Sequence, residues 1–211
     1  SSSMDMLVNT DLRNIQTVND YIQNFGSGAR FKLKSKEYIT IIQHPVTTEY
    51  LENQMNIRET IQALNNIDLP KIWIMPNMDA GADAINKEIR RYKETENSIK
   101  THFFKSLPIE IYGPVLKNTL CIIGNSSSGI REAAFLGTPT VNIGSRQNGR
   151  ERGVNVIDVG YSAEEIQKAV LSQIKIMNYP KDDRYGNGLS SEKILKVIKT
   201  AHVNVQKTNT Y

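Results

Sequence analysis

Short apolar runs alternate along most of this chain with segments whose apolar residues recur every three to four positions. The runs predict strands, because a few consecutive buried residues are typical of a parallel sheet. We expect these strands at residues 38–43, 71–75, 100–104, 120–123, 140–143 and 154–159. The helical spacing predicts helices at residues 48–65, 82–92, from about 128, 163–176 and 191–203. This alternation indicates an α/β fold: a doubly wound parallel sheet, Rossmann-like, with helices on both faces, starting near residue 36.

The first 35 residues stand apart from this alternation. Asp11 is placed to cap a helix, and a Gly-Ser-Gly break at residues 26–28 would end it. The apolar positions of that helix are Leu12, Ile15, Val18, Ile22 and Phe25. We therefore divide the chain into a linker and helix at residues 1–35 and one Rossmann-like domain with a C-terminal helix at residues 36–211.

The composition is that of an ordinary folded domain, and it limits the compartments and partners to be expected. Of 211 residues, 39% are hydrophobic and 23% are charged, with a formal net charge of +4. These values exclude a disordered tail, a collagen-like repeat and a coiled-coil rod, and no apolar run approaches the ~20 residues of a bilayer span. The single cysteine, Cys121, lies within an apolar run and is expected to be buried, which fits a reducing cytoplasm. The net charge favours anionic partners only weakly, and we expect neither nucleic acid nor membrane as a partner.

Polar segments rich in small residues follow four of the predicted strands. In open α/β sheets the ligand lies at the carboxyl ends of the strands, so these segments are the candidate site. They are His44-Pro45-Val46-Thr47-Thr48, Pro76-Asn77-Met78-Asp79-Ala80-Gly81, the loop Gly124-Asn125-Ser126-Ser127-Ser128-Gly129-Ile130-Arg131-Glu132, and the arginine-rich segment 144–153.

The loop at residues 124–132 has the composition of an anion site at a helix start, where backbone N–H groups and the helix dipole favour a phosphate. The alternative is that one of its serines only caps an ordinary helix. A P-loop is excluded because Ile130 and Arg131 stand where Lys and Ser/Thr would bind phosphate and Mg²⁺. A nucleophile elbow is excluded because the frame around Ser127 lacks its first glycine. No GxGxxG motif indicates a dinucleotide.

Three side chains near these strand ends suit a nucleotide, and each also has a plainer interpretation. Glu132 lies one turn into the predicted helix, where it would accept hydrogen bonds from ribose hydroxyls or merely favour the helix start. Arg146 closely follows a predicted strand, and its guanidinium suits phosphate oxygens; the plainer interpretation is a solvated charge in a loop with three arginines. His44 lies at the carboxyl edge of the sheet without a ligand cluster nearby, so we expect neither a metal nor a cofactor.

Together these segments resemble the carboxyl-terminal half of the hydrolysing UDP-N-acetylglucosamine 2-epimerases, in the same order along the chain. Tyr179-Pro180 and Tyr185-Gly186-Asn187-Gly188 resemble the final loop of the same family. That family is similar to GT-B glycosyltransferases, in which two Rossmann-like domains face each other and the second binds the nucleotide. The resemblance implies that this chain corresponds to that second domain.

The resemblance also implies roles for individual residues. Ser126 and Ser127 would hold the diphosphate, Glu132 the ribose hydroxyls and Arg146 a phosphate. Asn77 and His44 would face the diphosphate and the sugar, with His44 as the catalytic residue that gives a proton or a hydrogen bond to the leaving UDP. The backbone near Leu107 would meet the uracil.

The family's reaction is anti elimination of UDP from UDP-N-acetylglucosamine, followed by hydration to N-acetylmannosamine, as in the biosynthesis of sialic-acid-like sugars. The amino-terminal domain that carries the proton-moving carboxylates is expected to be missing, so this chain alone would bind UDP or a UDP-sugar without turnover. We expect any homo-oligomer to form through that domain. Two alternatives stay open: the donor-binding half of a GT-B glycosyltransferase, and a non-catalytic nucleotide-sugar-binding fragment.

Overall fold

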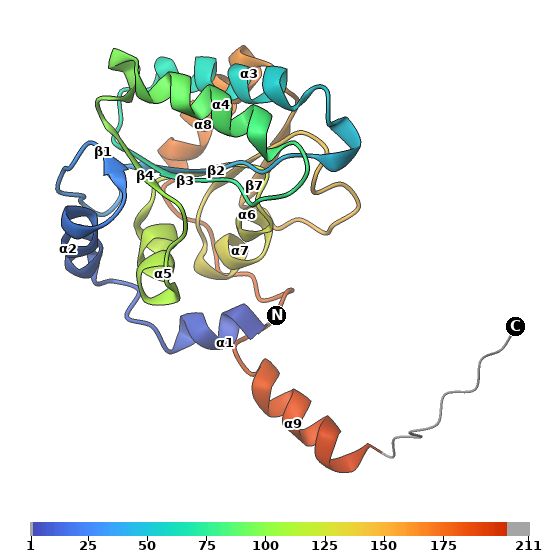
Figure 1. The fold of residues 1–211 in the computed structure, drawn as a ribbon. Coiled ribbons are helices and arrows are strands. Elements are labelled where there is room, and N and C mark those ends of the chain that lie inside the picture. Colours follow the sequence, from blue (N-terminus) through green and yellow to red (C-terminus); the bar gives the residue numbers. More distant parts are fainter. Residues whose placement is uncertain (1, 202–211) are drawn as a thin grey trace, which may run out of the picture.

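The fold is a sheet with helices on both faces, seen in a computed structural model that describes residues 2–201 (Figure 1). Its seven strands lie in the order β1-β4-β3-β2-β5-β6-β7. The strands are β1 (Ser27–Gly28), β2 (Ile39–Ile42), β3 (Lys71–Ile74), β4 (Thr101–Phe104), β5 (Ile122–Gly124), β6 (Thr140–Ile143) and β7 (Val156–Val159). Strands β2 to β7 are parallel, and their relative order is the 3-2-1-4-5-6 order of Rossmann folds. The predicted doubly wound parallel sheet is confirmed.

The chain reverses its direction of travel across the sheet between β2 and β5. From β2 it passes to β3 and β4 on one side, and then returns to β5, β6 and β7 on the other. Crossovers leave β2 and β5 in opposite directions, so a crevice forms between the loops that follow these two strands. The predicted site segments that begin at His44 and Gly124 flank this switch point.

The two faces of the sheet are covered by separate helix layers with separate cores (Figure 1). One layer consists of α3 (Asn53–Asn65), α4 (Ala82–Lys93) and α8 (Ala163–Ile176). The other consists of α1 (Ser2–Val8), α2 (Ile15–Asn24), α5 (Ile109–Asn118), α6 (Ser127–Ile130) and α7 (Glu132–Leu136). Trp73 and Ile123 are fully buried in the first core, and Tyr38 in the second. Cys121 is fully buried in the first core, as its apolar run predicted.

The amino-terminal helices pack onto the domain. Met4 and Leu7 of α1 and Val18 and Ile22 of α2 are completely buried in the second core. The predicted cap at Asp11 is wrong. Asp11 accepts the backbone N–H of Arg13 in a local turn, and α2 begins later, where the Asn14 side chain accepts the N–H of Thr17 at 3.1 Å.

Helices α1 and α5 and strand β1 were not predicted from the sequence. Residues 27–28, expected to be only a break, form β1, which pairs antiparallel with β4 at the edge of the sheet. Residues 109–118 form α5 despite Gly113 and Pro114, a pair that normally interrupts a helix. The helix persists because its buried residues pack into the second core. Gly113 fits this packing, since a Cβ there would lie only 2.9 Å from Leu12 and 3.0 Å from Leu7.

Two predicted helices are interrupted. The helix expected at 48–65 is a 3₁₀ turn, η1 (Thr47–Glu49), followed by α3. The helix expected from about residue 128 is divided into α6 and α7 at Arg131. A second 3₁₀ turn, η2 (Glu96–Ser98), precedes β4.

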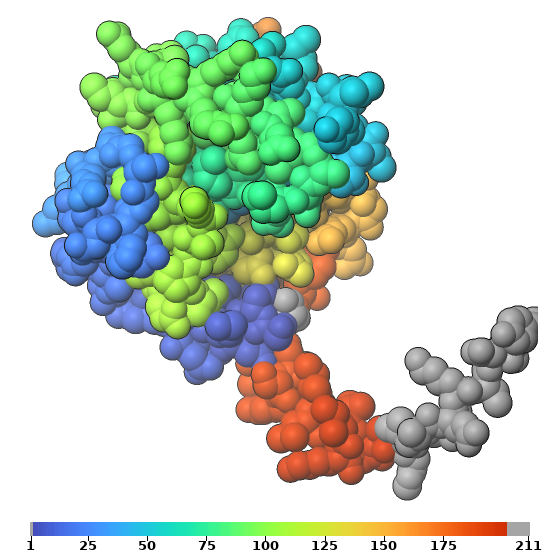
Figure 2. All heavy atoms as spheres, viewed as in Figure 1, coloured from blue at the N-terminus to red at the C-terminus, as the bar shows by residue number. Residues whose placement is uncertain are grey.

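Helix α9 (Ser190–Thr200) extends from the body of the domain, and among the described elements α1 packs against it most closely (Figures 1 and 2). Asp5 of α1 fixes its start by accepting the backbone N–H groups of Ser190 and Ser191. The last two residues of the helix predicted at 191–203 lie outside the described residues. Within residues 2–201, no helix is long and apolar enough to cross a bilayer.

Candidate functional site

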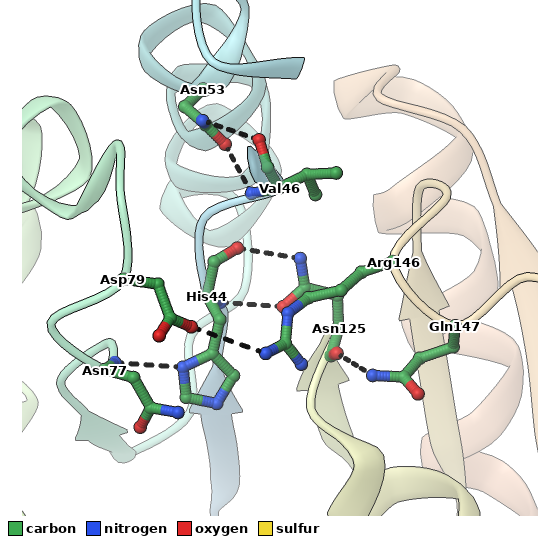
Figure 3. Close-up of polar contacts among 8 residues, drawn as sticks. All are labelled: His44, Val46, Asn53, Asn77, Asp79, Asn125, Arg146 and Gln147. Atoms are coloured by element: carbon green, nitrogen blue, oxygen red, sulfur yellow. Dashed lines mark hydrogen bonds and ion pairs between the residues drawn. The ribbon is translucent and has the colours of Figure 1, made fainter. Parts of the chain in front are cut away.

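The loops after β2 and β5 are joined directly by the side chain of Asn125. Its Oδ1 accepts the backbone N–H of His44 at 2.7 Å, and its Nδ2 donates to the His44 carbonyl at 2.8 Å (Figure 3). Gly124 makes this approach feasible. It has a φ of +131°, and a Cβ there would lie 2.1 Å from the carbonyl oxygen of Ile42.

The His44 ring is held as a neutral imidazole. Its Nδ1 accepts the backbone N–H of Asn77 at 3.1 Å (Figure 3). Burial, the largest effect, and the nearby Arg146 charge together lower its pKa from 6.5 to about 4, although the Asp79 carboxylate opposes them. Because Nδ1 accepts a hydrogen bond, the proton of the neutral ring is on Nε2. His44 is therefore a hydrogen-bond donor at neutral pH rather than a cation.

Arg146 lies over the switch point from the loop that follows β6. Its guanidinium forms an ion pair with Asp79, which follows β3, with Nη2 and Oδ2 3.6 Å apart (Figure 3). The neighbouring Gln147 donates to the Asn125 carbonyl at 2.6 Å and ties this loop to β5. Asp79 and Arg146 both line a hollow of about 250 Å³. Its other lining residues are Pro45, Val46, Thr47, Thr48 and Ser145.

The segment after His44 has its own anchor. The Asn53 side chain accepts the N–H of Val46 at 2.9 Å and donates to the Val46 carbonyl at 3.1 Å (Figure 3). Glu49, in the 3₁₀ turn between them, accepts hydrogen bonds from the hydroxyls of Ser145 and Tyr161. These bonds connect the loops after β2 and β6 and fix the walls of the hollow.

The serine loop differs from the expected helix start. Ser126 caps α6 by accepting the N–H of Ser128 at 3.3 Å, but α6 is only four residues long. A macrodipole of that length is small, so the expected contribution of the helix dipole to anion binding is largely absent. Ser127 accepts from the Arg131 guanidinium at 3.2 Å, which places a cation at this loop instead.

Glu132 is a buried carboxylate beside this loop, with only 4% of its surface exposed. Its Oε1 accepts the Ser3 hydroxyl at 2.6 Å and lies 3.7 Å from the Arg131 Nη2. Its Oε2 is buried without a hydrogen-bond partner among the residues that the structure describes. A buried carboxylate oxygen needs donors, and ribose hydroxyls would provide them.

The predicted site residues form two groups in space, and Leu107 lies apart from both. His44, Asn77 and Arg146 gather at the switch point. Ser126, Ser127 and Glu132 lie after β5, at the starts of the short helices α6 and α7. Leu107 lies in the loop after β4, where its side chain packs against the second core. Three residues that organise the switch point had no predicted role: Asn125, Asp79 and Gln147. Each one lies at or shortly after the end of a strand, and this position in the sequence could have identified it as a site residue.

Two other features do not belong to this site. The Nε of Arg152 lies 2.6 Å from the Asp158 carboxylate, so this third arginine of segment 144–153 has a local partner. A larger hollow of about 900 Å³ runs along the edge strand β7, and it includes Ser145 but none of the predicted site residues. Polar side chains from separate strands converge at the switch point, and we therefore regard it as the candidate site.

Comparisons with known proteins agree with this assignment of the fold. The UDP-N-acetylglucosamine 2-epimerase from Neisseria meningitidis is 29% identical over 213 residues, covering 98% of this chain and 53% of that protein. The hydrolysing UDP-N,N'-diacetylbacillosamine 2-epimerase from Legionella pneumophila is 33% identical over 174 residues, covering 82% of this chain and 45% of that protein. The chain therefore spans about half the length of these relatives.

A solved structure has the same fold. The Neisseria meningitidis UDP-GlcNAc 2-epimerase bound to UDP-GlcNAc matches with a TM-score of 0.68 at 15% identity, over 94% of this chain and 53% of that chain. The sequence profile described as UDP-N-acetylglucosamine 2-epimerase matches residues 5–199. This match extends over nearly the whole chain, and the chain belongs to the UDP-N-acetylglucosamine 2-epimerase family.

Proposed function

We propose that this chain is the UDP-binding half of a hydrolysing UDP-N-acetylglucosamine 2-epimerase, which acts on UDP-N-acetylglucosamine or a close N-acylated relative. The observation that supports this most is that His44 and Arg146 meet at the switch point between β2 and β5, beside the segment after β5 that carries Ser126 and Ser127. The hydrolysing reaction named for the Legionella relative agrees with it. On this proposal the product enters the biosynthesis of sialic-acid-like sugars.

The nucleotide would lie across the two groups of site residues. Arg146 would bind a phosphate through its guanidinium, and Ser126 and Ser127 would donate hydroxyl hydrogen bonds to the diphosphate. The unpartnered Oε2 of Glu132 would accept a ribose hydroxyl. We place the uracil near the backbone of Leu107, on the β4 side of the site.

In the elimination the C1–O bond breaks, the electron pair leaves with UDP, and the C2 proton is removed by a base. The base is expected from the other half of such an enzyme. This half would stabilise the negative charge that develops on the leaving diphosphate. His44 would donate a hydrogen bond from Nε2, since the low pKa leaves its ring without a second proton to transfer. Asn77 orients that ring through its backbone N–H.

Calorimetry with UDP on the full 211-residue chain tests the proposal. We expect saturable binding and an increase in melting temperature. Arg146→Ala should weaken binding by about 2–5 kcal/mol, the range for truncating one partner of a charged hydrogen bond. Arg150→Ala, an exposed arginine in the same loop, is the matched control and should leave the affinity unchanged.

Two results would contradict the proposal at different levels. If millimolar UDP gives neither heat nor a melting shift, nucleotide binding is rejected. If Arg146→Ala binds like the unchanged chain, this arginine does not belong to the site. A full-length relative that carries this half should release UDP from UDP-N-acetylglucosamine without an acceptor. A strict requirement for an acceptor would instead identify a glycosyltransferase.

A further inference from the structure

Asp79 places a negative charge where the proposed site needs a positive one. It follows β3, whereas Arg146 follows β6, and the two side chains meet over the switch point beside His44 (Figure 3). The ion pair is loose, because its 3.6 Å separation exceeds the roughly 2.8 Å of a charged hydrogen bond. Both side chains are accessible to a ligand, since Asp79 is 44% exposed and Arg146 is 27% exposed.

The charge of Asp79 can be removed without disturbing the turn that contains it. The backbone carbonyl of Asp79 accepts the N–H of Ala82 at 3.0 Å and so leads the chain into α4. Gly81, with a φ of +93°, provides the left-handed residue of the same turn. An amide at position 79 would keep this backbone and the side-chain shape and remove only the charge.

Free UDP and a UDP-sugar differ in charge at the phosphate that reaches this hollow. The terminal phosphate of UDP loses a second proton near pH 6, so UDP has about three negative charges at pH 7.5. In a UDP-sugar that oxygen is esterified, and about two charges remain. A carboxylate in the same hollow therefore repels the product more strongly than the substrate.

We propose that Asp79 is a competing counter-ion for Arg146 that weakens the binding of free UDP more than that of the UDP-sugar, and so promotes product release. The inference rests on the proposed function and adds a specificity-determining residue to its site. When the nucleotide binds, a phosphate replaces the Asp79 carboxylate at the guanidinium. The displaced carboxylate remains in the hollow, next to the most highly charged end of the product.

Calorimetry of Asp79→Asn with UDP and with UDP-N-acetylglucosamine, at pH 7.5 and one fixed salt concentration, tests this inference. We expect the Kd for UDP to fall roughly tenfold and the Kd for the UDP-sugar to fall only about threefold. The control Asp83→Asn makes the same charge change at an exposed position of the first turn of α4, and should change neither Kd. In a chain that also carries Arg146→Ala, Asp79→Asn should increase the affinity for UDP by less, because Asp79 then has no guanidinium for which to compete with the phosphate.

The outcomes separate this inference from the function on which it rests. A chain that binds neither nucleotide overturns the proposed function and this inference together. UDP binding that Asp79→Asn leaves unchanged or weakens overturns the inference alone. Equal tightening of both ligands also overturns it, because no preference for the substrate would then exist. A loss of UDP-sugar affinity with unchanged UDP affinity would show that Asp79 holds the sugar instead.

Discussion

Acidification is expected to destabilise the fold through His44 in particular. The pKa of this ring falls from its ordinary value of 6.5 to about 4 in the folded chain. Between these two values the unfolded chain binds a proton and the folded chain does not, so stability decreases as the pH falls. Above pH 6.5 the ring is neutral in both states and has no such effect. Over this window of roughly 2.5 pH units the loss is on the order of 3 kcal/mol.

Urea denaturation at pH values from 7.5 to 4.5 measures this loss, with His44→Asn as the comparison. The Asn side chain does not titrate, and its Oδ1 can accept the Asn77 N–H that Nδ1 accepts now. The variant has its own stability at pH 7.5 and should lose about 2.5 kcal/mol less of it by pH 4.5, since that range covers about 2 of the roughly 2.5 pH units. Other titrating groups are common to both chains and cancel in the difference. Parallel pH profiles for the two chains would refute the assignment of a buried, neutral His44.

Three further substitutions test the geometry of the site. Ser126→Ala should weaken UDP binding by about 1 kcal/mol in calorimetry, since backbone donors remain; a loss as large as that of Arg146→Ala would contradict this ranking. Asn125→Ala leaves the buried N–H and C=O of His44 unpaired and should lower the free energy of unfolding by about 2–5 kcal/mol, measured with urea. Gly124→Ala should cost at least ~3 kcal/mol, because its Cβ would overlap the Ile42 carbonyl; an unchanged melting temperature would contradict that close approach.

Much of the sheet was predictable because its strands are fully buried. The apolar runs of β2 to β6 have no exposed position to obscure them, and residues 140–143 and 163–176 were predicted with the bounds that the structure has. Helix α5 was missed because Gly113 and Pro114 oppose a helix locally, and only packing against distant residues overrides them. Strand β1 is too short to produce a periodic signal and exists through its pairing with β4.

The candidate site was predictable in outline for a similar reason. A strand end can be located from the sequence, so His44, Asn77 and Arg146 could be assigned to one edge of the sheet. The bonds of Asn125 to His44 span 81 positions and depend on which strands are neighbours, which the sequence alone does not reveal. The approach of Asp79 to Arg146 likewise requires β3 and β6 to lie on opposite sides of β2 and β5.

The two hydrogen bonds between the Asn125 side chain and the His44 backbone link ligand binding to the order of folding. They join segments far apart in sequence, and they can form only after β2 and β5 have paired at the centre of the sheet. A nucleotide that binds there should slow amide exchange in these central strands most, and leave the fraying of β1 and β7 at the margins almost untouched.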